Sequence, residues 1–299
     1  MMAGMVDNIT LVKDCKPPPQ FYKAKEKPFE YKGCIYSPKF NNGQIVRYEG
    51  QIKNIRLFMY PEKVYLLNSL HKFHKGNNYS DFTKSELRAA IEAISDITGI
   101  RWKEATVKKI EYGCNVSTDA ANAIYSLQSY KGKDYQPMAK NGIRYGAACE
   151  FAQYRIKGYN KTFEVNREDN QINLQTPLFR WEVQVKNPQY FNRMKQPVIS
   201  AAQLLTGKAL FILAKDAIEK YENSIKMQHL NLYRLSAEQK KIIAVMLNPE
   251  IRQDFKIHHK EAYKKYNRIY RQIMQDKSIC PGDNTGQILA AKFAELLAN

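Results

Sequence analysis

Two glutamates, each placed between large apolar residues, are the first candidates for chemistry. Glu111 lies in the run Lys109-Ile110-Glu111-Tyr112-Gly113, and Glu182 lies in Phe179-Arg180-Trp181-Glu182-Val183-Gln184-Val185-Lys186. This alternation predicts strands. Two carboxylates on the polar face of one sheet suit Mg²⁺ or Mn²⁺, which prefer hard oxygen ligands. A glutamate on the outer face of a strand is more often only solvated, so the pattern by itself leaves both readings open.

A tyrosine between two lysines is the candidate nucleophile. Tyr159 lies in the run Lys157-Gly158-Tyr159-Asn160-Lys161. An unperturbed tyrosine has a pKa of about 10, and neighbouring ammonium groups favour the phenolate, which is the better nucleophile. The chain has 20 tyrosines and 47 lysines and arginines, so a tyrosine beside a lysine is also expected by composition alone.

The sequence lacks the signatures of several other catalytic classes. It contains no P-loop, no Gly-x-Ser-x-Gly and no Cys-x-x-Cys motif. The five cysteines are odd in number and widely spaced, which does not indicate a disulfide framework. His71 and His74 have a spacing that zinc accepts but no companion ligand nearby, so we expect them to be loop or DNA-facing residues.

The charge of the chain points to a polyanionic partner. Its 299 residues carry 47 Lys+Arg against 29 Asp+Glu, a formal net charge of +18. Such an excess favours nucleic acid first and an anionic membrane surface second. Hydrophobic residues make up 44%, which is typical of a folded protein. No apolar stretch is long enough to cross a bilayer and no secretory signal is evident, so a cytoplasmic location is expected.

Periodicity predicts the elements that must position these residues. Strands are predicted at residues 7–13, 51–67 (two strands with a turn at 60–63), 105–116, 147–159 and 178–186. Helices are predicted at residues 84–98, 118–126, 198–226, 237–274 and 287–297, and a loop at 131–142. We expect an α+β domain over residues 1–197, with an antiparallel-rich sheet and flanking helices. A helical region at 198–299, with a DNA-binding or accessory role, is expected to follow.

One segment resembles a known signature. The run Ser69-Leu70-His71-Lys72-Phe73-His74-Lys75-Gly76-Asn77-Asn78-Tyr79-Ser80-Asp81-Phe82 is similar to that of phage and plasmid replication initiators from Bacteroidetes-type elements, distant relatives of the filamentous-phage gene-two replication protein. Three later segments follow in the order of that family: residues 110–113, 156–161 and 179–186. The resemblance covers about residues 50–195, and the order and spacing of the motifs carry it.

The resemblance implies a rolling-circle initiator with the nicking-domain fold of that family. Such a protein cuts one strand at an origin with a tyrosine, keeps the 5′ phosphate as a phosphotyrosine, leaves a 3′-OH for synthesis and later rejoins the ends. The motif positions imply these roles: Tyr159 as nucleophile, Lys161 and Lys186 as supports of the phosphate or phenolate, and Glu111, Glu182 and Asn160 as ligands of Mg²⁺ or Mn²⁺. Asn160 replaces an aspartate of the family pattern and would ligate through its uncharged carbonyl.

Origin DNA, single-stranded or extruded as a hairpin, is the expected partner. A host helicase and polymerase would act after it, and no membrane partner is expected. The expected DNA contacts are basic residues of the motifs and of the C-terminal helices: Lys157, Arg180, His71, Lys72, Lys256, Lys260 and Arg268. Three alternatives stay open: a non-catalytic, sequence-specific nucleic-acid-binding protein on the same fold, a structural basic protein without origin preference, and a metal-dependent nuclease that uses water.

Overall fold

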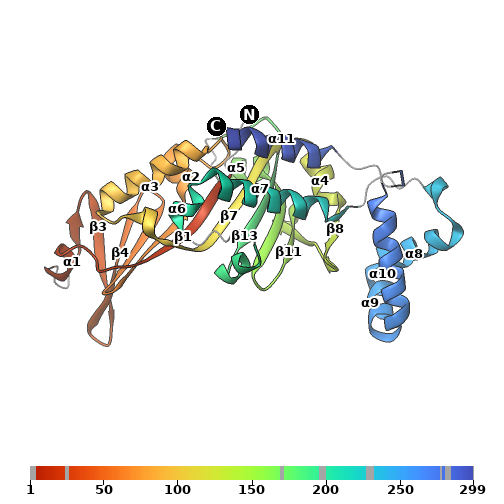
Figure 1. Ribbon diagram of the computed structural model, residues 1–299, viewed down its shortest axis with the longest axis horizontal. Helices are drawn as coiled ribbons and strands as arrows, with labels where there is room; N and C mark the ends of the chain where they lie inside the picture. Colours follow the sequence, from red (N-terminus) through yellow and green to blue (C-terminus); the bar gives the residue numbers. More distant parts are fainter. Residues whose placement is uncertain are drawn as a thin grey trace.

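The computed structural model describes residues 5–23, 27–168, 172–194, 200–226, 232–276, 278–279 and 284–298. It is a mixed α+β protein, in which a long antiparallel sheet carries the helices α3, α7 and α11 along one side and further helices follow toward the C-terminus (Figure 1). None of the helices in the described ranges is both long and apolar enough to span a bilayer.

The elements have the following bounds. The large sheet contains β1 (Val6–Asp14), β2 (Phe29–Tyr31), β3 (Cys34–Asn41), β4 (Gln44–Ile52), β5 (Ile55–Tyr60), β6 (Lys63–Ser69), β7 (Thr106–Ser117), β10 (Gln136–Lys140), β11 (Ile143–Glu150), β12 (Tyr154–Asn160) and β13 (Leu178–Val185). A small sheet contains β8 (Leu127–Tyr130), β9 (Lys133–Asp134) and β14 (Ile225–Lys226). The α-helices are α1 (Gln20–Lys23), α2 (Leu70–Lys75), α3 (Lys84–Thr98), α4 (Ala120–Ser126), α5 (Lys161–Glu168), α6 (Ala201–Leu204), α7 (Gly207–Glu222), α8 (Ala237–Leu247), α9 (Pro249–His258), α10 (Lys260–Gln275) and α11 (Thr285–Ala298). Short 3₁₀ helices are η1 (Trp102–Glu104), η2 (Pro188–Arg193) and η3 (Leu232–Arg234).

The order of the strands repeats one topology twice. Across the sheet it is β10-β11-β12-β13-β7-β1-β6-β5-β4-β3-β2, with β1 and β7 side by side in the middle. The meander β3 to β6 follows β1 and brings β6 beside it, and the meander β10 to β13 follows β7 and brings β13 beside it. The chain therefore consists of two halves of similar layout that meet at the central strand pair.

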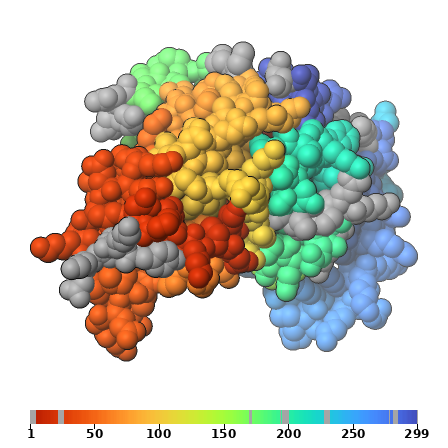
Figure 2. All heavy atoms as spheres, turned by 60° about the vertical axis from the view of Figure 1, so that its left-hand side comes forward, coloured from red at the N-terminus to blue at the C-terminus, as the bar shows by residue number. Residues whose placement is uncertain are grey.

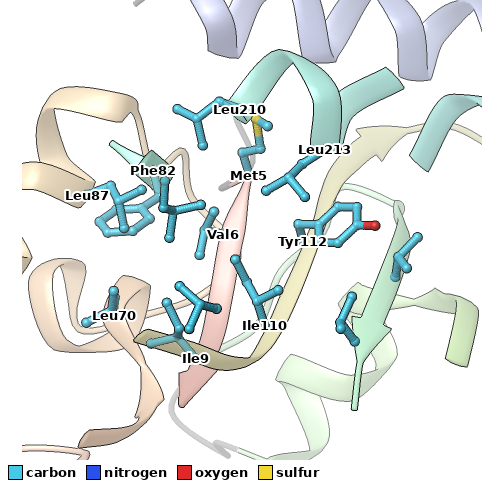
Figure 3. Close-up of a cluster of buried hydrophobic side chains, with 14 of the residues drawn as sticks. Met5, Val6, Ile9, Leu70, Phe82, Leu87, Ile110, Tyr112, Leu210 and Leu213 are labelled. Carbon is cyan, nitrogen blue, oxygen red and sulfur yellow. The ribbon is translucent and has the colours of Figure 1, made fainter. Parts of the chain in front are cut away.

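The hydrophobic core joins these halves on one face of the sheet. Leu87 of α3 and Leu210 and Leu213 of α7 gather over Val6 of β1 and Ile110 of β7 (Figure 3). Each fully buried aliphatic side chain of this kind contributes about 1.5–3 kcal/mol to folding. Packing on one face therefore fixes the backbone of the central strand pair. The side chains on the other face project from this rigid backbone.

Helix α3 shows why the sequence was informative about local structure. Thr83 and Glu86 form a reciprocal capping box at its start, and Gly99 ends it with a φ of 70°. Its buried side follows the helical spacing of the apolar residues, so the prediction of a helix at 84–98 is confirmed. The central strands and the strand at 178–186 are also confirmed, as β1, β7 and β13.

Other sequence-based expectations are wrong in detail. Residues 147–159 form two strands, β11 and β12, and the predicted loop at 131–142 contains β9 and β10. Residues 237–274 form three helices. Asn248 caps α9 and Pro249 begins it, and His259 separates α9 from α10. Strands β2 to β4 lie in a stretch for which no sheet was predicted, since Pro and Lys interrupt its apolar pattern.

The helical region after residue 197 is not a single unit. The predicted boundary itself falls within 195–199, outside the described residues. Helices α6, α7 and α11 belong to the core of the sheet, whereas α8 and α10 form a separate cluster around Ile242, Met246 and Tyr270. We call α8–α10 the C-terminal lobe. It stands at the opposite end of the molecule from the β3–β4 hairpin, and the two form separate projections (Figures 1 and 2).

Candidate metal and nucleophile site

Strand register brings the predicted site residues to one face of the sheet. Glu182 of β13 lies between Gly113 of β7 and Lys157 of β12, and Tyr159 lies opposite Arg180. Successive side chains on a strand alternate between faces. The apolar residues of β13 therefore face α7, where the indole of Trp181 donates to the carbonyl of Ala217 at 2.9 Å. Glu182 and Arg180 face the other way.

Three carboxylates meet on this second face. Oxygens of Asp7, Glu111 and Glu182 all lie within 4.8 Å of one another. The convergence of the two glutamates was predicted, but the participation of Asp7 was not. The register between β1 and β7 shifts between Val6 and Ile9, and this bulge lets both Asp7 and Asn8 reach the face that carries the acids. We call Asp7, Glu111 and Glu182 the acidic triad.

Arg180 is the central counter-charge of the triad. Its side chain is 0% exposed. Its Nε donates to Glu182 at 2.6 Å and its Nη2 to Asp7 at 3.3 Å, while Nη1 donates to Asn115 at 3.1 Å. A buried charge is tolerated only when it is paired and hydrogen-bonded, and the planar guanidinium suits two carboxylates at once. The expectation that Arg180 contacts DNA is therefore wrong for this structure, because it is a buried structural cation.

Glu182 is ionised despite its burial. Lys157 Nζ forms an ion pair with Oε1 of Glu182. Burial raises the pKa of Glu182, but the charges of Lys157 and Arg180 outweigh burial and hold this pKa well below its ordinary value. Lys157 was expected to contact DNA, and the structure instead places it mainly against the triad, with a side chain 15% exposed.

Glu111 differs from Glu182 in that its hydrogen-bond partners are amides. It accepts from Asn8 Nδ2 at 2.8 Å and from Gln184 Nε2 at 2.5 Å. Burial, followed by the negative charge of Glu182, raises the pKa of Glu111 to about 7. At neutral pH this carboxyl is therefore partly protonated, and a proton occupies a position that a cation would also favour.

Asp7 is held by the segment that carried the family resemblance. Ser69 Oγ donates to Oδ1 of Asp7 in a short hydrogen bond, and Asn78 Nδ2 donates to Oδ2 at 3.2 Å. The segment therefore acts as a support for one member of the triad. Asp7 could have been suspected only from its place as the first polar residue of a strand, which is a weak signal.

The hydroxyl of Tyr159 adjoins the triad but is buried. It donates to Glu182 Oε2 at 3.3 Å, and Tyr159 is 4% exposed. Lys157 Nζ and Lys161 Nζ each lie 5.9 Å from the centre of its ring. Burial and then the charge of Glu182 raise the pKa of Tyr159 well above its ordinary value. The expectation that neighbouring lysines favour the phenolate is therefore wrong for the structure as it stands.

The other predicted site residues lie around this centre. Lys161 is 1% exposed and bonds to Glu164 at 2.5 Å, and burial, with Arg180, lowers its pKa. Asn160 Oδ1 accepts from the backbone N–H of Phe163 at 2.9 Å, and strand alternation turns it away from the face of Tyr159. Asn160 therefore does not join the carboxylates as predicted, and the third member of the acidic cluster is Asp7.

Lys186 lies at the edge of a groove next to the triad. It pairs with Glu150 and lines, together with Glu111, a groove of about 420 Å³. This position suits a contact with a phosphate in the groove better than a contact with the Tyr159 oxygen.

The remaining expected DNA contacts divide into buried and exposed residues. His71 is 0% exposed and stacks on Phe82 at 4.9 Å, and burial lowers its pKa to about 4, so the expectation that it faces DNA is wrong. Lys72 has a side chain 41% exposed. Lys256, Lys260 and Arg268 are exposed on α9 and α10, so their role as DNA contacts stays a prediction.

The donor set of the triad fits a hard divalent cation. Three carboxylates converge, which is the ligand chemistry of Mg²⁺ and Mn²⁺. Arg180 and Lys157 already neutralise part of the charge, so a cation would compete with them and with the proton on Glu111.

Comparison with known proteins adds no family to this geometry. A scan against protein-family models and a search of curated proteins return no match for the chain. The site itself therefore carries the functional argument.

Proposed function

We propose that this chain is a replication initiator that nicks one DNA strand at an origin through Tyr159 and later rejoins the ends. One observation carries the proposal: the Tyr159 hydroxyl lies 3.3 Å from a carboxylate oxygen of a cluster of three acids. A nucleophile beside a metal-binding carboxylate cluster is the arrangement that phosphoryl transfer to a side chain requires. In this proposal the α+β sheet is the nicking domain of the initiator family that the sequence resembles.

The reaction is a transesterification at phosphorus. The Tyr159 oxygen gives up its proton and attacks the scissile phosphorus, the bond from phosphorus to the 3′ oxygen breaks, and the 3′ oxygen takes up a proton. The net change moves one proton from the tyrosine hydroxyl to the new 3′-OH. The 5′ phosphate stays on the tyrosine. The reverse step rejoins the strand without ATP, in keeping with a sequence that has no P-loop motif. Glu182 Oε2 accepts the hydrogen bond of the hydroxyl and so orients the attacking oxygen.

Asp7, Glu111 and Glu182 would hold Mg²⁺ or Mn²⁺, which neutralises charge on the non-bridging oxygens of a phosphate. Lys157 and Lys161, whose ammonium groups flank the tyrosine ring, supply positive charge to the same phosphate. Because Tyr159 is 4% exposed, the side chains that cover it must move before a phosphate can reach its oxygen.

The burial of Tyr159 also favours a second candidate function. A protein that binds nucleic acid in a sequence-specific way but does not cut it would keep the fold and the basic surface without needing access to this hydroxyl. The two functions differ in one measurable product, a covalent bond between protein and DNA.

The first prediction tests this product. The protein is incubated with Mn²⁺ or Mg²⁺ and with supercoiled or single-stranded DNA of the replicon that encodes it, and the products are separated on a denaturing gel. We expect a protein–DNA adduct that disappears in Tyr159→Phe, in EDTA and in Glu182→Gln, because each change removes the nucleophile, the cation or one of its ligands.

Tyr154→Phe is the matched control. Tyr154 lies on the same strand, five residues away and on the opposite face, so its hydroxyl cannot replace that of Tyr159. This variant should keep the adduct. Nicking without any adduct would instead show a nuclease that uses water, and binding without nicking would support the second candidate.

A further inference from the structure

The sheet face that carries the acidic triad continues into an aromatic surface on the first half of the sheet. Strand register places Phe58 opposite Tyr65, and Tyr60 and Tyr65 contact each other edge to face at 5.5 Å. The guanidinium of Arg47 lies 5.3 Å from the ring of Phe58, and that of Arg56 lies 5.1 Å from it. We call these five residues the arginine–aromatic patch.

The patch and the triad are on the same face of the sheet. Tyr65 is two residues before Leu67 on β6, and Leu67 pairs with Thr10 of β1. Asn8, two residues before Thr10, donates to Glu111 of the triad. Because every second residue of a strand shares a face, these contacts link the patch to the triad without a change of side.

A groove fills the space between them. Its volume is about 420 Å³, and it crosses β6, β1, β7 and β13. Its lining includes apolar, amide and basic side chains, with Glu111 at the triad: Asn8, Thr10, Leu67, Lys109, Glu111 and Lys186. Lys109 is exposed, so the groove offers a cation to a chain of phosphates.

The arginine–aromatic patch is not part of the hydrophobic core. The opposite face of the same strands is fully buried, with Leu57, Met59 and Leu66 at 0–1% exposure, whereas Phe58, Tyr60 and Tyr65 are only half-buried. Arg56 is exposed, and within the described ranges no carboxylate lies within 4.0 Å of its guanidinium. Arg47 is held by Glu49 at 2.6 Å, which fixes its plane against the rings.

From this juxtaposition we propose that single-stranded DNA lies across this face, with bases stacked on Phe58, Tyr60 and Tyr65 and with its backbone following the groove to the acidic triad. Aromatic rings stack on any base, and arginine and lysine side chains attract the phosphates, so such a surface binds without reading sequence. The bases must be unpaired because paired bases in a duplex already stack on one another. The inference rests on the proposed function, since it supplies the path of the strand that Tyr159 would cut.

The test measures binding in EDTA, where no metal-dependent reaction interferes. The probe is a fluorescent oligothymidine of about 15 nucleotides, followed by fluorescence anisotropy. We expect the double variant Phe58→Ala, Tyr65→Ala to bind at least about tenfold more weakly than the unmodified protein, because stacking on each ring contributes substantially to affinity. Tyr233→Ala is the control, since Tyr233 is 99% exposed on η3 and lies outside the patch. It should bind like the unmodified protein.

Two further measurements guard against a folding defect. The single variant Tyr65→Phe keeps the ring, so its affinity should stay within about twofold of that of the unmodified protein. An oligonucleotide with 5-bromouracil should cross-link under ultraviolet light to peptides that contain Phe58, Tyr60 or Tyr65. Unchanged affinity in the double variant, an equal loss of affinity for a duplex of the same length, or cross-links confined to α9 and α10 would each overturn the inference.

Failure of this inference and failure of the proposed function give different results. If Tyr159→Phe leaves nicking intact while the double variant loses single-strand binding, the nucleophile assignment fails and the binding surface stands. If the adduct depends on Tyr159 but the double variant binds normally, the strand takes another path and the proposed chemistry stands.

Discussion

At the residue scale, the acidic triad contains three carboxyl groups, and its two paired cations, Arg180 and Lys157, contact only two of them. Arg180 pairs with Asp7 and Glu182, and Lys157 pairs with Glu182, but Glu111 is held by two amides. Burial of ionisable groups costs stability unless every charge is paired. Perturbed and incompletely paired groups of this kind are concentrated at functional sites.

The second prediction concerns the stability cost of Glu111. Its pKa is about 7 in the folded protein against an ordinary value of 4.5. Between these two pH values the folded state binds more protons than the unfolded state, so stability falls as pH rises through this window. Glu111→Gln removes this pH-dependent decline. In EDTA, the free energy of unfolding of Glu111→Gln minus that of the unmodified protein should be about 1–3 kcal/mol larger at pH 8 than at pH 5.

The measurement is denaturant unfolding of both proteins at the two pH values. Glu92→Gln is the control, because Glu92 is an exposed glutamate on α3 and should show no such pH-dependent gain. Equal stability differences at pH 5 and pH 8 for Glu111→Gln would show that Glu111 is not a proton-holding member of the triad. Any change in hydrogen-bond geometry caused by the substitution is the same at both pH values and therefore cancels.

The sequence predicted part of this site because part of it is local. Alternation in the two strands was enough to place Glu111 and Glu182 on one polar face, and the motif pointed to Tyr159. Asp7 was missed because its orientation depends on a bulge in the pairing of β1 with β7, which are about 100 residues apart in the chain. The prediction for Asn160 came from the family motif. Strand alternation already places Asn160 on the opposite face from Tyr159, its neighbour in the chain.

At the element scale, the pairing of β7 with β13 decides where two members of the triad lie. Glu182 sits opposite Gly113, and the N–H of Gly113 also donates to the carbonyl of Met5 at 2.9 Å. A Cβ at Gly113 would lie 2.1 Å from the carbonyl oxygen of Trp181 and 2.8 Å from Cα of Glu182. These are backbone atoms, so relief requires the strands themselves to move. A glycine is therefore needed here for close approach.

The third prediction follows from this close approach. Gly113→Ala should lower the free energy of unfolding by at least about 2 kcal/mol and should weaken Mn²⁺ binding, because it spreads β7 and β13 at the triad. Denaturant unfolding and calorimetric titration with Mn²⁺ measure the two effects.

Gly207→Ala provides the matched substitution at another glycine. Gly207 begins α7, and a Cβ there meets nothing within 4 Å. This variant should be unchanged or about 0.5 kcal/mol more stable, because alanine restricts the unfolded chain. If both glycine variants behave alike, the register argument for the site is wrong.

Elements were easiest to predict where one strong period coincides with end signals. Helix α3 has a capping box, a regular apolar face and a terminal glycine, and its predicted bounds are those observed. Strands β2 to β4 lack such a signal: their core face contains Cys34, Tyr36 and Tyr48, and residues such as Pro38 interrupt the pattern. Their place at the end of the sheet is fixed by the pairing of β4 with β5, of β3 with β4 and of β2 with β3, which local sequence does not encode.

At the scale of the whole molecule, the acidic triad lies where the two halves meet. Asp7 comes from β1 of the first half, and Glu111 and Glu182 come from β7 and β13 of the second. The site is therefore complete only when both halves pair correctly. The C-terminal lobe takes no part in this pairing and has its own hydrophobic cluster.

The fourth prediction concerns the role of the C-terminal lobe. Lys260, Lys264 and Arg268 follow a spacing of four residues on α10, so they share one exposed side of the helix, and Lys256 is exposed on α9. If this side contacts duplex DNA beside the origin, each neutralised phosphate releases counterions, and the logarithm of affinity falls with the logarithm of salt concentration. The triple variant Lys256→Gln, Lys260→Gln, Arg268→Gln should reduce that slope by about 0.9 for each phosphate that is no longer neutralised, or by about 2–3 in all.

The same variant should still form the Tyr159 adduct on a short single-stranded substrate, because the lobe contributes no member of the acidic triad. The charge-matched control is the triple variant Lys208→Gln, Lys215→Gln, Arg88→Gln. It removes the same amount of charge from helices α7 and α3, which pack on the sheet. A smaller salt slope in both triple variants would show that only total charge matters. A smaller slope in the lobe variant alone would show that the lobe binds the duplex, while the sheet carries out strand cleavage.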